Sequence, residues 1–221
     1  MSSLRLIRFT VILPFLLSFI VANAQDPHRF DNEIAQIRLK DYQVTKGEKV
    51  VVFTGSSSIR MWTDVQKYFP DVVAINTGFG GSHMSDLLYF ANETIIKFRP
   101  SEVFIYEGDN DLDAKKTPEA ILATTKQLID KLRDKLPDLQ IVLISAKPSL
   151  ARWKLKNSFI RLNQLFRDYC NGQPDVRFAN IWDSMLGTDG TPRKDIFLED
   201  GLHMNKTGYG LWFNVLKAYI N

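Results

Sequence analysis

Four short runs of consecutive apolar residues and a weaker fifth divide the chain, and the first three are each followed by a polar, glycine-containing segment. The runs cover residues 50–53, 72–75, 103–106, 141–144 and 176–179. Apolar runs of this length, without alternation, are typical of strands that are covered on both faces. We therefore expect five strands in the interior of the domain.

Between these runs the apolar residues recur at helical spacing. Such patterns predict helices over residues 30–43, 84–96, 117–136, 159–169 and 211–220. Thr117 with Pro118 after it is a typical helix start. Strands that alternate with helices predict a three-layer α/β/α sandwich around a central, mainly parallel sheet of five strands. In such a sheet, ligands bind beyond the carboxyl ends of the strands.

The N-terminal segment has the composition of an export signal. Arg5 and Arg8 precede an apolar stretch over residues 9–22, and Ala22-Asn23-Ala24 is a small-x-small cleavage pattern. The stretch is shorter than the roughly 20 residues that a membrane span needs. We therefore expect residues 1–24 to be a cleaved signal peptide and residues 25–221 to form one domain, with an uncleaved anchor as the alternative. The mature chain is expected in the periplasm or outside the cell, without a membrane span.

Charge and cysteine content exclude several classes of function. Without the two arginines of the signal, 28 − 2 = 26 basic residues face 25 acidic ones, so a nucleic-acid partner is not expected. The single cysteine, Cys170, excludes an internal disulfide and fits a buried apolar position. One cysteine and three scattered histidines are too few for a zinc site. We expect neither a metal nor another cofactor.

Four polar segments hold the candidate chemistry, and three of them follow predicted strands directly. They are Gly55-Ser56-Ser57-Ser58, Asn76-Thr77-Gly78-Phe79-Gly80-Gly81-Ser82, Glu107-Gly108-Asp109-Asn110-Asp111 and, near the C-terminus, Asp200-Gly201-Leu202-His203. Each segment alone is an ordinary loop sequence. Their order along the chain, together with their position at strand ends, is much more specific.

A serine hydroxyl becomes a useful nucleophile only when a base takes its proton. The chain has three histidines, and His28 is expected to be solvated near the mature N-terminus, whereas His83 follows the glycine turn and could line the pocket. His203 follows Asp200 by three residues, and a carboxylate in that place can hold the imidazole in one tautomer. His203 is therefore the best candidate base.

The four segments resemble, in order, the conserved blocks of the SGNH hydrolases, also called GDSL-like lipases and acylhydrolases. The resemblance spans residues 50–209 and implies a flavodoxin-like sandwich and hydrolysis of acyl esters. It implies the following site residues: Ser57 as nucleophile and oxyanion donor, Gly81 and Asn110 as further oxyanion donors, Gly78 as the alternative glycine, and Asp200 with His203 as acid and base. Ser56 departs from the pattern, because many members have aspartate there.

The resemblance leaves the substrate open between acetyl groups on glycans and lysophospholipids or other small esters. Arg152 and Trp153 follow the fourth strand, so they are expected on the active face, where they could form a substrate wall or merely cap the core. Glu107, Asp109 and Asp111 line the mouth of the site or lie in a solvated loop.

Two alternatives to an esterase stay open. One is a flavodoxin-like module that binds phosphate or flavin at the serine-rich turn. The other is an inactive relative that binds glycans. The sequence leaves the oligomeric state undetermined.

Overall fold

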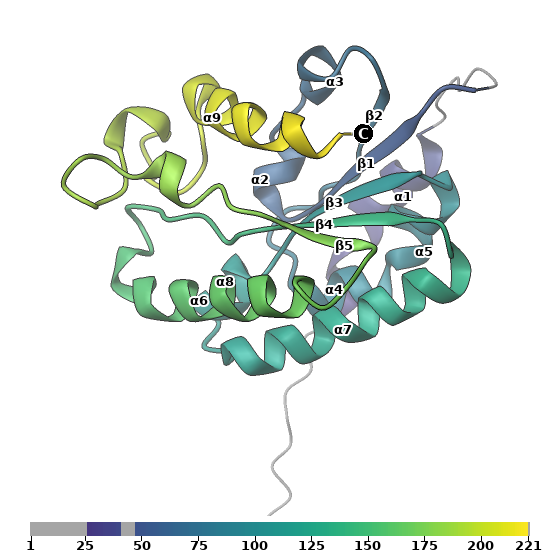
Figure 1. Cartoon of the computed structure of the whole chain (residues 1–221), viewed down its shortest axis with the longest axis horizontal. Coiled ribbons are helices and arrows are strands. Elements are labelled where there is room, and N and C mark those ends of the chain that lie inside the picture. The colour runs from purple at the N-terminus through teal and green to yellow at the C-terminus, as the bar shows by residue number, and fades with distance from the viewer. Residues whose placement is uncertain (1–25, 41–46, 221) are drawn as a thin grey trace, which may run out of the picture.

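The computed structural model describes residues 26–40 and 47–220, so the predicted signal peptide lies outside the described residues. Five parallel strands form one central sheet between two layers of helices (Figure 1). The strands are β1 (Val50–Gly55), β2 (Val73–Asn76), β3 (Glu102–Tyr106), β4 (Gln140–Ile144) and β5 (Val176–Ala179). Their order across the sheet is β2-β1-β3-β4-β5. The predicted α/β/α sandwich is thereby confirmed.

Helices cover both faces of the sheet, as Figure 1 shows. One layer contains α1 (Asp31–Leu39), α4 (Met84–Tyr89), α5 (Ala91–Thr94), α7 (Pro118–Lys135) and α8 (Lys156–Cys170). The other contains α2 (Ser57–Arg60), α3 (Val65–Tyr68) and α9 (Lys206–Leu216). A further short helix, α6 (Asp109–Asp113), follows β3. Short 3₁₀ helices cover Pro27–Phe30, Ile96–Phe98, Trp153–Leu155, Asp183–Met185, Lys194–Ile196 and Lys217–Tyr219.

Successive strand residues point into opposite layers, which explains the continuous apolar runs. Val50 and Val52 belong to the core beneath α7 and α8, whereas Val51 and Phe53 belong to the core beneath α9. Both layers exclude water from the strands, so most strand positions carry apolar residues. Among the described residues, no helix is both long and apolar enough to cross a membrane.

The helix boundaries differ from the predicted ones where local capping overrides the apolar pattern. The segment predicted as one helix over residues 84–96 divides at Phe90 into α4 and α5. The last helix begins at Lys206, before the predicted start, because the Asn205 side chain accepts hydrogen bonds from the backbone N–H groups of Thr207 and Gly208. Helix α6 had no apolar pattern by which to be predicted.

Trp62 and Cys170 are buried in the core, and the burial of Cys170 confirms the prediction from the sequence. Trp62 has no exposed surface, and its ring stacks on that of Tyr209 with 5.2 Å between centroids. Tyr209 also donates a hydrogen bond of 2.9 Å to the Ser58 carbonyl. Helix α9 is in this way fastened to the short helix α2.

Gly55, the last residue of β1, is positioned so closely to β3 that only glycine fits. Its φ is +132°, and a Cβ atom would lie 1.9 Å from the Tyr106 carbonyl oxygen. The same carbonyl accepts a hydrogen bond of 3.2 Å from the Ser56 N–H. The turn that leads from β1 into α2 therefore rests directly on the end of β3.

We expect the substitution Gly55→Ala to destabilise the fold by about 1–3 kcal/mol or more, because both the steric clash and the positive φ oppose a side chain. Gly210→Ala is the matched control, since nothing lies within 4 Å of its Cβ position in α9. Alanine in a helix should leave stability unchanged or raise it slightly. Chemical denaturation measures both changes, and equal stability of the two variants would contradict the argument.

Candidate active site

The carboxyl edge of the sheet gathers the first three polar segments that the sequence analysis identified. Strand β1 lies between β2 and β3, so the segments after these strands are neighbours. Phe79 N–H donates to the Gly55 carbonyl at 2.9 Å, which joins the second segment to the first. The Asn110 amide donates to the Ser82 carbonyl at 2.9 Å, which joins the third to the second. The three loops thus form one hydrogen-bonded unit.

Ser57, His203 and Asp200 form a hydrogen-bonded chain across 146 residues of sequence. The Ser57 hydroxyl lies 2.9 Å from His203 Nε2, and His203 Nδ1 lies 2.6 Å from Asp200 Oδ2. Ser57 is the first residue of α2, and the acid and base come from the loop before α9. This is the arrangement in which a carboxylate orients an imidazole that in turn contacts a hydroxyl.

Asp200 is held in place by its own loop. Its Oδ1 atom accepts hydrogen bonds of 2.9 Å from the backbone N–H groups of Leu202 and His203, which leaves Oδ2 for the imidazole. Partial desolvation raises the pKa of Asp200, but the hydrogen bond from His203 and the two backbone donors outweigh it and lower the pKa to about 2. The carboxylate is therefore ionised at any pH at which the fold is expected to work.

The loop of Asp200 and His203 is anchored on both sides. Leu198 N–H donates to the His203 carbonyl at 2.8 Å, and Phe197 pairs with Met204 in an antiparallel bridge. Ala151 N–H donates to the Gly201 carbonyl at 3.1 Å, so the segment after β4 supports the same loop. These contacts fix the distance between the imidazole and α2.

Several backbone N–H groups of the first two loops have no hydrogen-bond acceptor within the described part of the chain, and two of them are candidate oxyanion donors. These two belong to Ser57, at the start of α2, and to Gly81, which is exposed and has a φ of +78°. The Gly78 N–H, by contrast, donates to the Asn76 side chain at 3.0 Å. Of the two glycines considered, Gly81 is the one whose N–H is available to a ligand.

Asn110 lies in α6 with its amide directed toward the second loop. One N–H of its Nδ2 group bonds Ser82, and the other has no acceptor among the described residues. Its Oδ1 atom accepts two hydrogen bonds of 3.1 Å from Arg152. The side chain that the family resemblance assigns to the oxyanion hole is thus held from two sides.

The acidic residues around Asn110 are buried, which corrects the interpretation of this segment as a solvated loop. Glu107, Asp109 and Asp111 expose 1%, 3% and 1% of their surfaces. Asp109 accepts from the Tyr106 hydroxyl at 2.9 Å and from Lys147 Nζ at 2.8 Å. The sequence contained no signal for this burial, because the basic partners come from distant segments.

Glu107 supports the glycine loop through a neutral carboxyl group. A hydroxyl has a single hydrogen, and Ser82 Oγ lies 3.0 Å from the Phe79 carbonyl and 2.5 Å from Glu107 Oε1, so both contacts are hydrogen bonds only if Glu107 donates the second. Glu107 then carries the proton. Burial, and secondly the charge of Asp111, raise the pKa of Glu107 well above its usual range, in agreement with this assignment.

The other two histidines contact acidic groups rather than Ser57. His28 is exposed and contacts Asp31 at 3.2 Å. His83 is buried, and its Nδ1 atom lies 3.7 Å from Asp111, an acid that is distant in sequence. Burial lowers the pKa of His83 despite that neighbour. Within the described ranges, His203 is the histidine whose ring bonds a serine hydroxyl.

Trp153 and Arg152 occupy different environments although they are adjacent. The Trp153 ring stacks on Trp182 with 5.9 Å between centroids, whereas the Arg152 guanidinium turns toward α6.

Residues 26–40 and 47–220 contain no cluster of three or more His, Cys, Asp or Glu side chains that could hold a metal ion.

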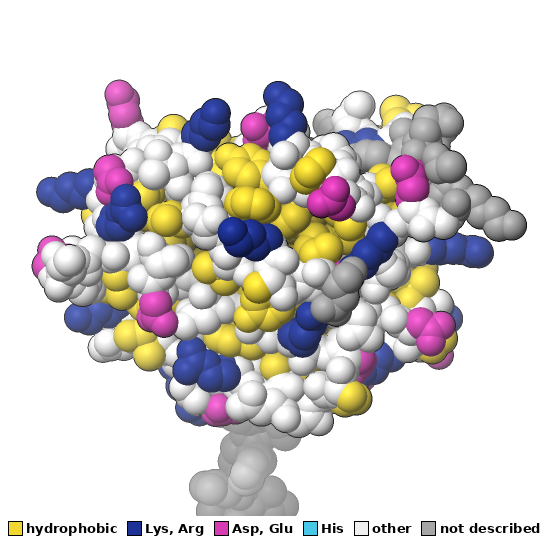
Figure 2. Space-filling view, turned by 45° about the horizontal axis from the view of Figure 1, so that its top comes forward, with side chains coloured by type: hydrophobic (Ala, Val, Ile, Leu, Met, Phe, Trp, Pro, Cys, Tyr) yellow, Lys and Arg dark blue, Asp and Glu magenta, His cyan; other side chains and the backbone are white. Residues whose placement is uncertain are grey.

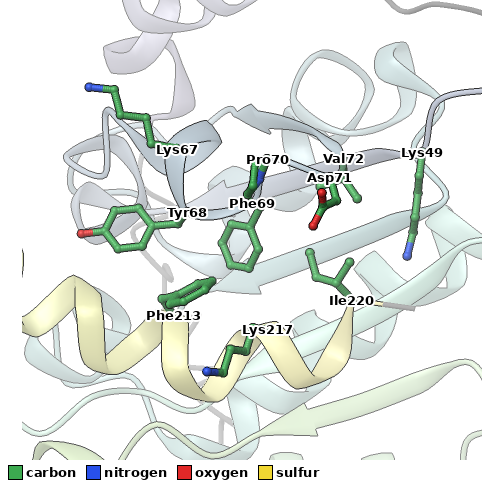
Figure 3. A pocket seen from close by; sticks show the side chains of 10 residues that line it. All are labelled: Lys49, Lys67, Tyr68, Phe69, Pro70, Asp71, Val72, Phe213, Lys217 and Ile220. Carbon is green, nitrogen blue, oxygen red and sulfur yellow. The ribbon is translucent and has the colours of Figure 1, made fainter.

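A cavity of about 710 Å³ lies at the opposite edge of the sheet from the triad. Figure 3 shows it between α3 and α9, beside Lys49 and Val72, which directly precede β1 and β2. Figure 2 brings this side forward and shows hydrophobic side chains in the middle of the face among basic and acidic ones. The cavity takes no part in the site described above.

The amino-acid sequence also matches the model of a known protein family. The model of the GDSL-like lipase/acylhydrolase family matches residues 44–211. The chain belongs to this family. Its match includes Ser57, Gly81, Asn110, Asp200 and His203.

Solved structures of this fold resemble the family member described here. A GDSL-like lipase from Bacteroides thetaiotaomicron is 20% identical, with a TM-score of 0.69, and the match covers 88% of this chain and 96% of that one. A protein from Streptococcus pneumonia, linked by name to platelet activating factor, is 20% identical with a TM-score of 0.76 over 86% and 91% of the two chains.

A catalytic mutant of an acetylxylan esterase from Geobacillus stearothermophilus is 15% identical, with a TM-score of 0.61 over 80% of this chain and 95% of that one. At these identities the likenesses show the fold alone. A comparison with curated proteins found no match.

We expect Glu107→Gln to stabilise the protein increasingly as the pH rises above about 4.5. In the wild type, the unfolded chain releases this carboxyl proton at its usual pKa, whereas the buried Glu107 retains it, so folding loses stability with rising pH. Glutamine keeps a donor to Ser82 and does not ionise. The difference in unfolding free energy should grow by on the order of 1 kcal/mol per pH unit in that range.

Unfolding midpoints measured from pH 4 to pH 8 test this expectation. Glu119→Gln is the control, because Glu119 is exposed and its pKa is lowered by the hydrogen bond from Arg161. That variant should show no gain with rising pH. A constant difference between the wild type and E107Q would contradict the protonated state of Glu107.

Proposed function

We propose that the protein is an exported serine esterase that hydrolyses acyl esters through a covalent Ser57 acyl-enzyme. The observation that carries this proposal is the pair of distances along the triad: 2.9 Å from Ser57 Oγ to His203 Nε2 and 2.6 Å from His203 Nδ1 to Asp200. Membership of a lipase and acylhydrolase family supports the same chemistry.

The reaction follows from the geometry. His203 Nε2 takes the hydroxyl proton while Ser57 Oγ forms a bond to the ester carbonyl carbon. Asp200 stabilises the resulting imidazolium. Collapse of the tetrahedral intermediate breaks the ester bond, and the imidazolium gives its proton to the departing alcohol. Water then repeats the sequence and releases the acid.

The negative oxygen of each tetrahedral intermediate needs preorganised donors. The N–H groups of Ser57 and Gly81 and the second N–H of the Asn110 amide are donors that have no acceptor in the described part of the chain. Removing one donor of this kind typically lowers turnover by about 10²–10³. We assign these three groups to the oxyanion hole.

We favour an acetyl ester on a glycan as the substrate. Asp200 is about half exposed, and the apolar side chains of Leu150 and Leu198 beside its loop are exposed by 37% and 43%. A site this open suits a polar polymer chain better than a long acyl chain, which it would not enclose. The stacked Trp153 and Trp182, which follow β4 and β5, offer aromatic surface on the same edge of the sheet.

The flavodoxin-like alternative has less support. Helix α2 comprises four residues, so its N-terminus provides little of the dipole that helps to hold a phosphate. That interpretation also leaves the Asp200–His203–Ser57 chain without a role. An inactive glycan-binding protein would have no need of a hydroxyl bonded to an imidazole.

Ser57→Ala should abolish hydrolysis, with turnover reduced roughly 10⁴-fold or more. The assay compares the mature protein on p-nitrophenyl esters of increasing chain length, acetylated xylan and a lysophospholipid, and a fluorophosphonate probe should label Ser57. Ser58→Ala, the adjacent serine whose backbone carbonyl faces Tyr209, is the control and should stay active.

Three results would overturn parts of this proposal. Full activity of S57A would exclude the acyl-enzyme. Preference for the lysophospholipid would replace the glycan substrate. Flavin absorbance in the purified protein without probe labelling would favour the binding module.

Export rests on the N-terminal pattern alone and has its own test. When the full chain is expressed in a bacterial host, protein recovered outside the cytoplasm should begin at Gln25. Leu16→Arg, which interrupts the apolar stretch, should leave uncleaved protein inside the cell. Intact chains in the cytoplasm of cells that express the wild type would contradict export.

A further inference from the structure

All side-chain hydrogen bonds that Arg152 makes with the described residues reach a single helix. Its guanidinium bonds Asp109, the Oδ1 atom of Asn110 through both terminal nitrogens at 3.1 Å, and Asp113 at 3.2 Å. These three residues all belong to α6. Only 13% of the Arg152 side chain is exposed. A side chain so engaged has little left with which to bind a substrate.

The chemistry of a guanidinium decides which way the Asn110 amide faces. Every nitrogen of arginine donates and none accepts, so the Asn110 atom against Arg152 must be the carbonyl oxygen. The amide nitrogen then faces the Ser82 carbonyl, where it can donate at 2.9 Å. In the reversed orientation, the NH₂ group would meet a cation and the oxygen would meet another carbonyl oxygen.

Asp109 holds the Arg152 guanidinium in place through an ion pair. This carboxylate is buried and also accepts from Lys147 Nζ at 2.8 Å and from the Tyr106 hydroxyl at 2.9 Å. Burial acts to raise the pKa of Asp109, but the charges of Lys147 and Arg152 outweigh it and lower the pKa to about 2. The pairing therefore persists across the working pH range.

The backbone next to Arg152 reaches the other half of the site. Ala151 N–H bonds the Gly201 carbonyl, and the Leu150 Cβ atom lies 3.0 Å from the position that a Cβ on Gly201 would take. One short segment after β4 thus contacts both the helix of Asn110 and the loop of Asp200. Its position relative to the two is set by packing as well as by charge.

We propose that Arg152 is a positioning residue that holds the Asn110 amide in the one orientation in which its second N–H is presented to the oxyanion. This inference rests on the proposed function. Arg152 acts through Asn110 and does not touch the substrate. Its removal should therefore affect the transition state more than the binding of the ester.

The test is a double-mutant cycle in kcat and KM on p-nitrophenyl acetate. Asn110→Ala should lower kcat by about 10²–10³. Arg152→Ala should lower kcat about tenfold, with KM changed less than about twofold, because the amide remains present but turns freely. In the Asn110→Ala background the same Arg152 substitution should cost less than about twofold, since the group that it positions is gone.

Two controls separate this role from loss of charge or of packing. Asp113→Asn removes the negative charge of one partner of Arg152 but leaves Asn110 in place, and it should keep kcat within about twofold. Arg161→Ala removes an exposed ion pair with Glu119 on the neighbouring helix and should do the same. Arg152→Lys keeps the positive charge beside Asp109 but loses the pair of guanidinium nitrogens that bond Asn110 Oδ1. Its kcat should therefore lie between those of the wild type and R152A.

A second measurement is independent of activity. The side-chain amide protons of Asn110, assigned by comparison of ¹⁵N spectra of the wild type and N110A, should exchange slowly in the wild type and in D113N. In R152A they should exchange about tenfold faster or more. This result concerns the hydrogen bonds between Arg152 and Asn110, so it can be obtained even if the protein hydrolyses no ester.

Each outcome decides one of the two claims. Lack of Ser57-dependent hydrolysis in the wild type would remove the proposed function, whatever the amide protons do. If hydrolysis is present, a tenfold effect of R152A that persists in the N110A background would overturn the positioning role. A rise in KM at constant kcat would assign Arg152 to substrate binding, and unchanged amide exchange in R152A would show that Ser82 alone holds Asn110.

Discussion

The contact between Gly55 and the end of β3 is the constraint on which the rest of the site depends. With a Cβ position 1.9 Å from the Tyr106 carbonyl, the chain can turn from β1 into α2 only at a glycine. That turn places Ser57 at the start of α2 and beside the loops after β2 and β3. The hydroxyl is thereby fixed by backbone packing, before any interaction with His203 is made.

The acid and base reach this hydroxyl from the far end of the chain. Helix α9 is fastened to α2 through Tyr209, and the loop in front of α9 is fastened to the segment after β4 through Gly201. A hydrogen bond between residues 146 positions apart needs both attachments, because neither partner has local contacts that would bring it to the other. The triad is therefore a property of the assembled fold.

Beneath the loops, buried charge replaces the apolar packing that is usual in a core. Asp109 pairs with both Lys147 and Arg152, and Glu107 is kept neutral next to Ser82. Breaking a buried pair by removing one partner costs far more than an exposed pair would, since the remaining charge is left unsolvated. These groups stiffen α6 and the glycine loop, which carry the proposed oxyanion donors Asn110 and Gly81.

The sequence alone determined the parallel α/β architecture, because apolar runs without alternation are stable only as strands covered on both faces. It also singled out Ser57, Asp200 and His203, whose residue types and order along the chain predicted their partnership. It did not reveal the burial of Asp109 and Glu107 or the direction in which Arg152 points. Those features depend on partners that are distant in the chain, such as Lys147 for Asp109 and Ser82 for Glu107. Only the tertiary structure decides them, because an isolated polar residue carries no local pattern that distinguishes a solvated side chain from a buried and paired one.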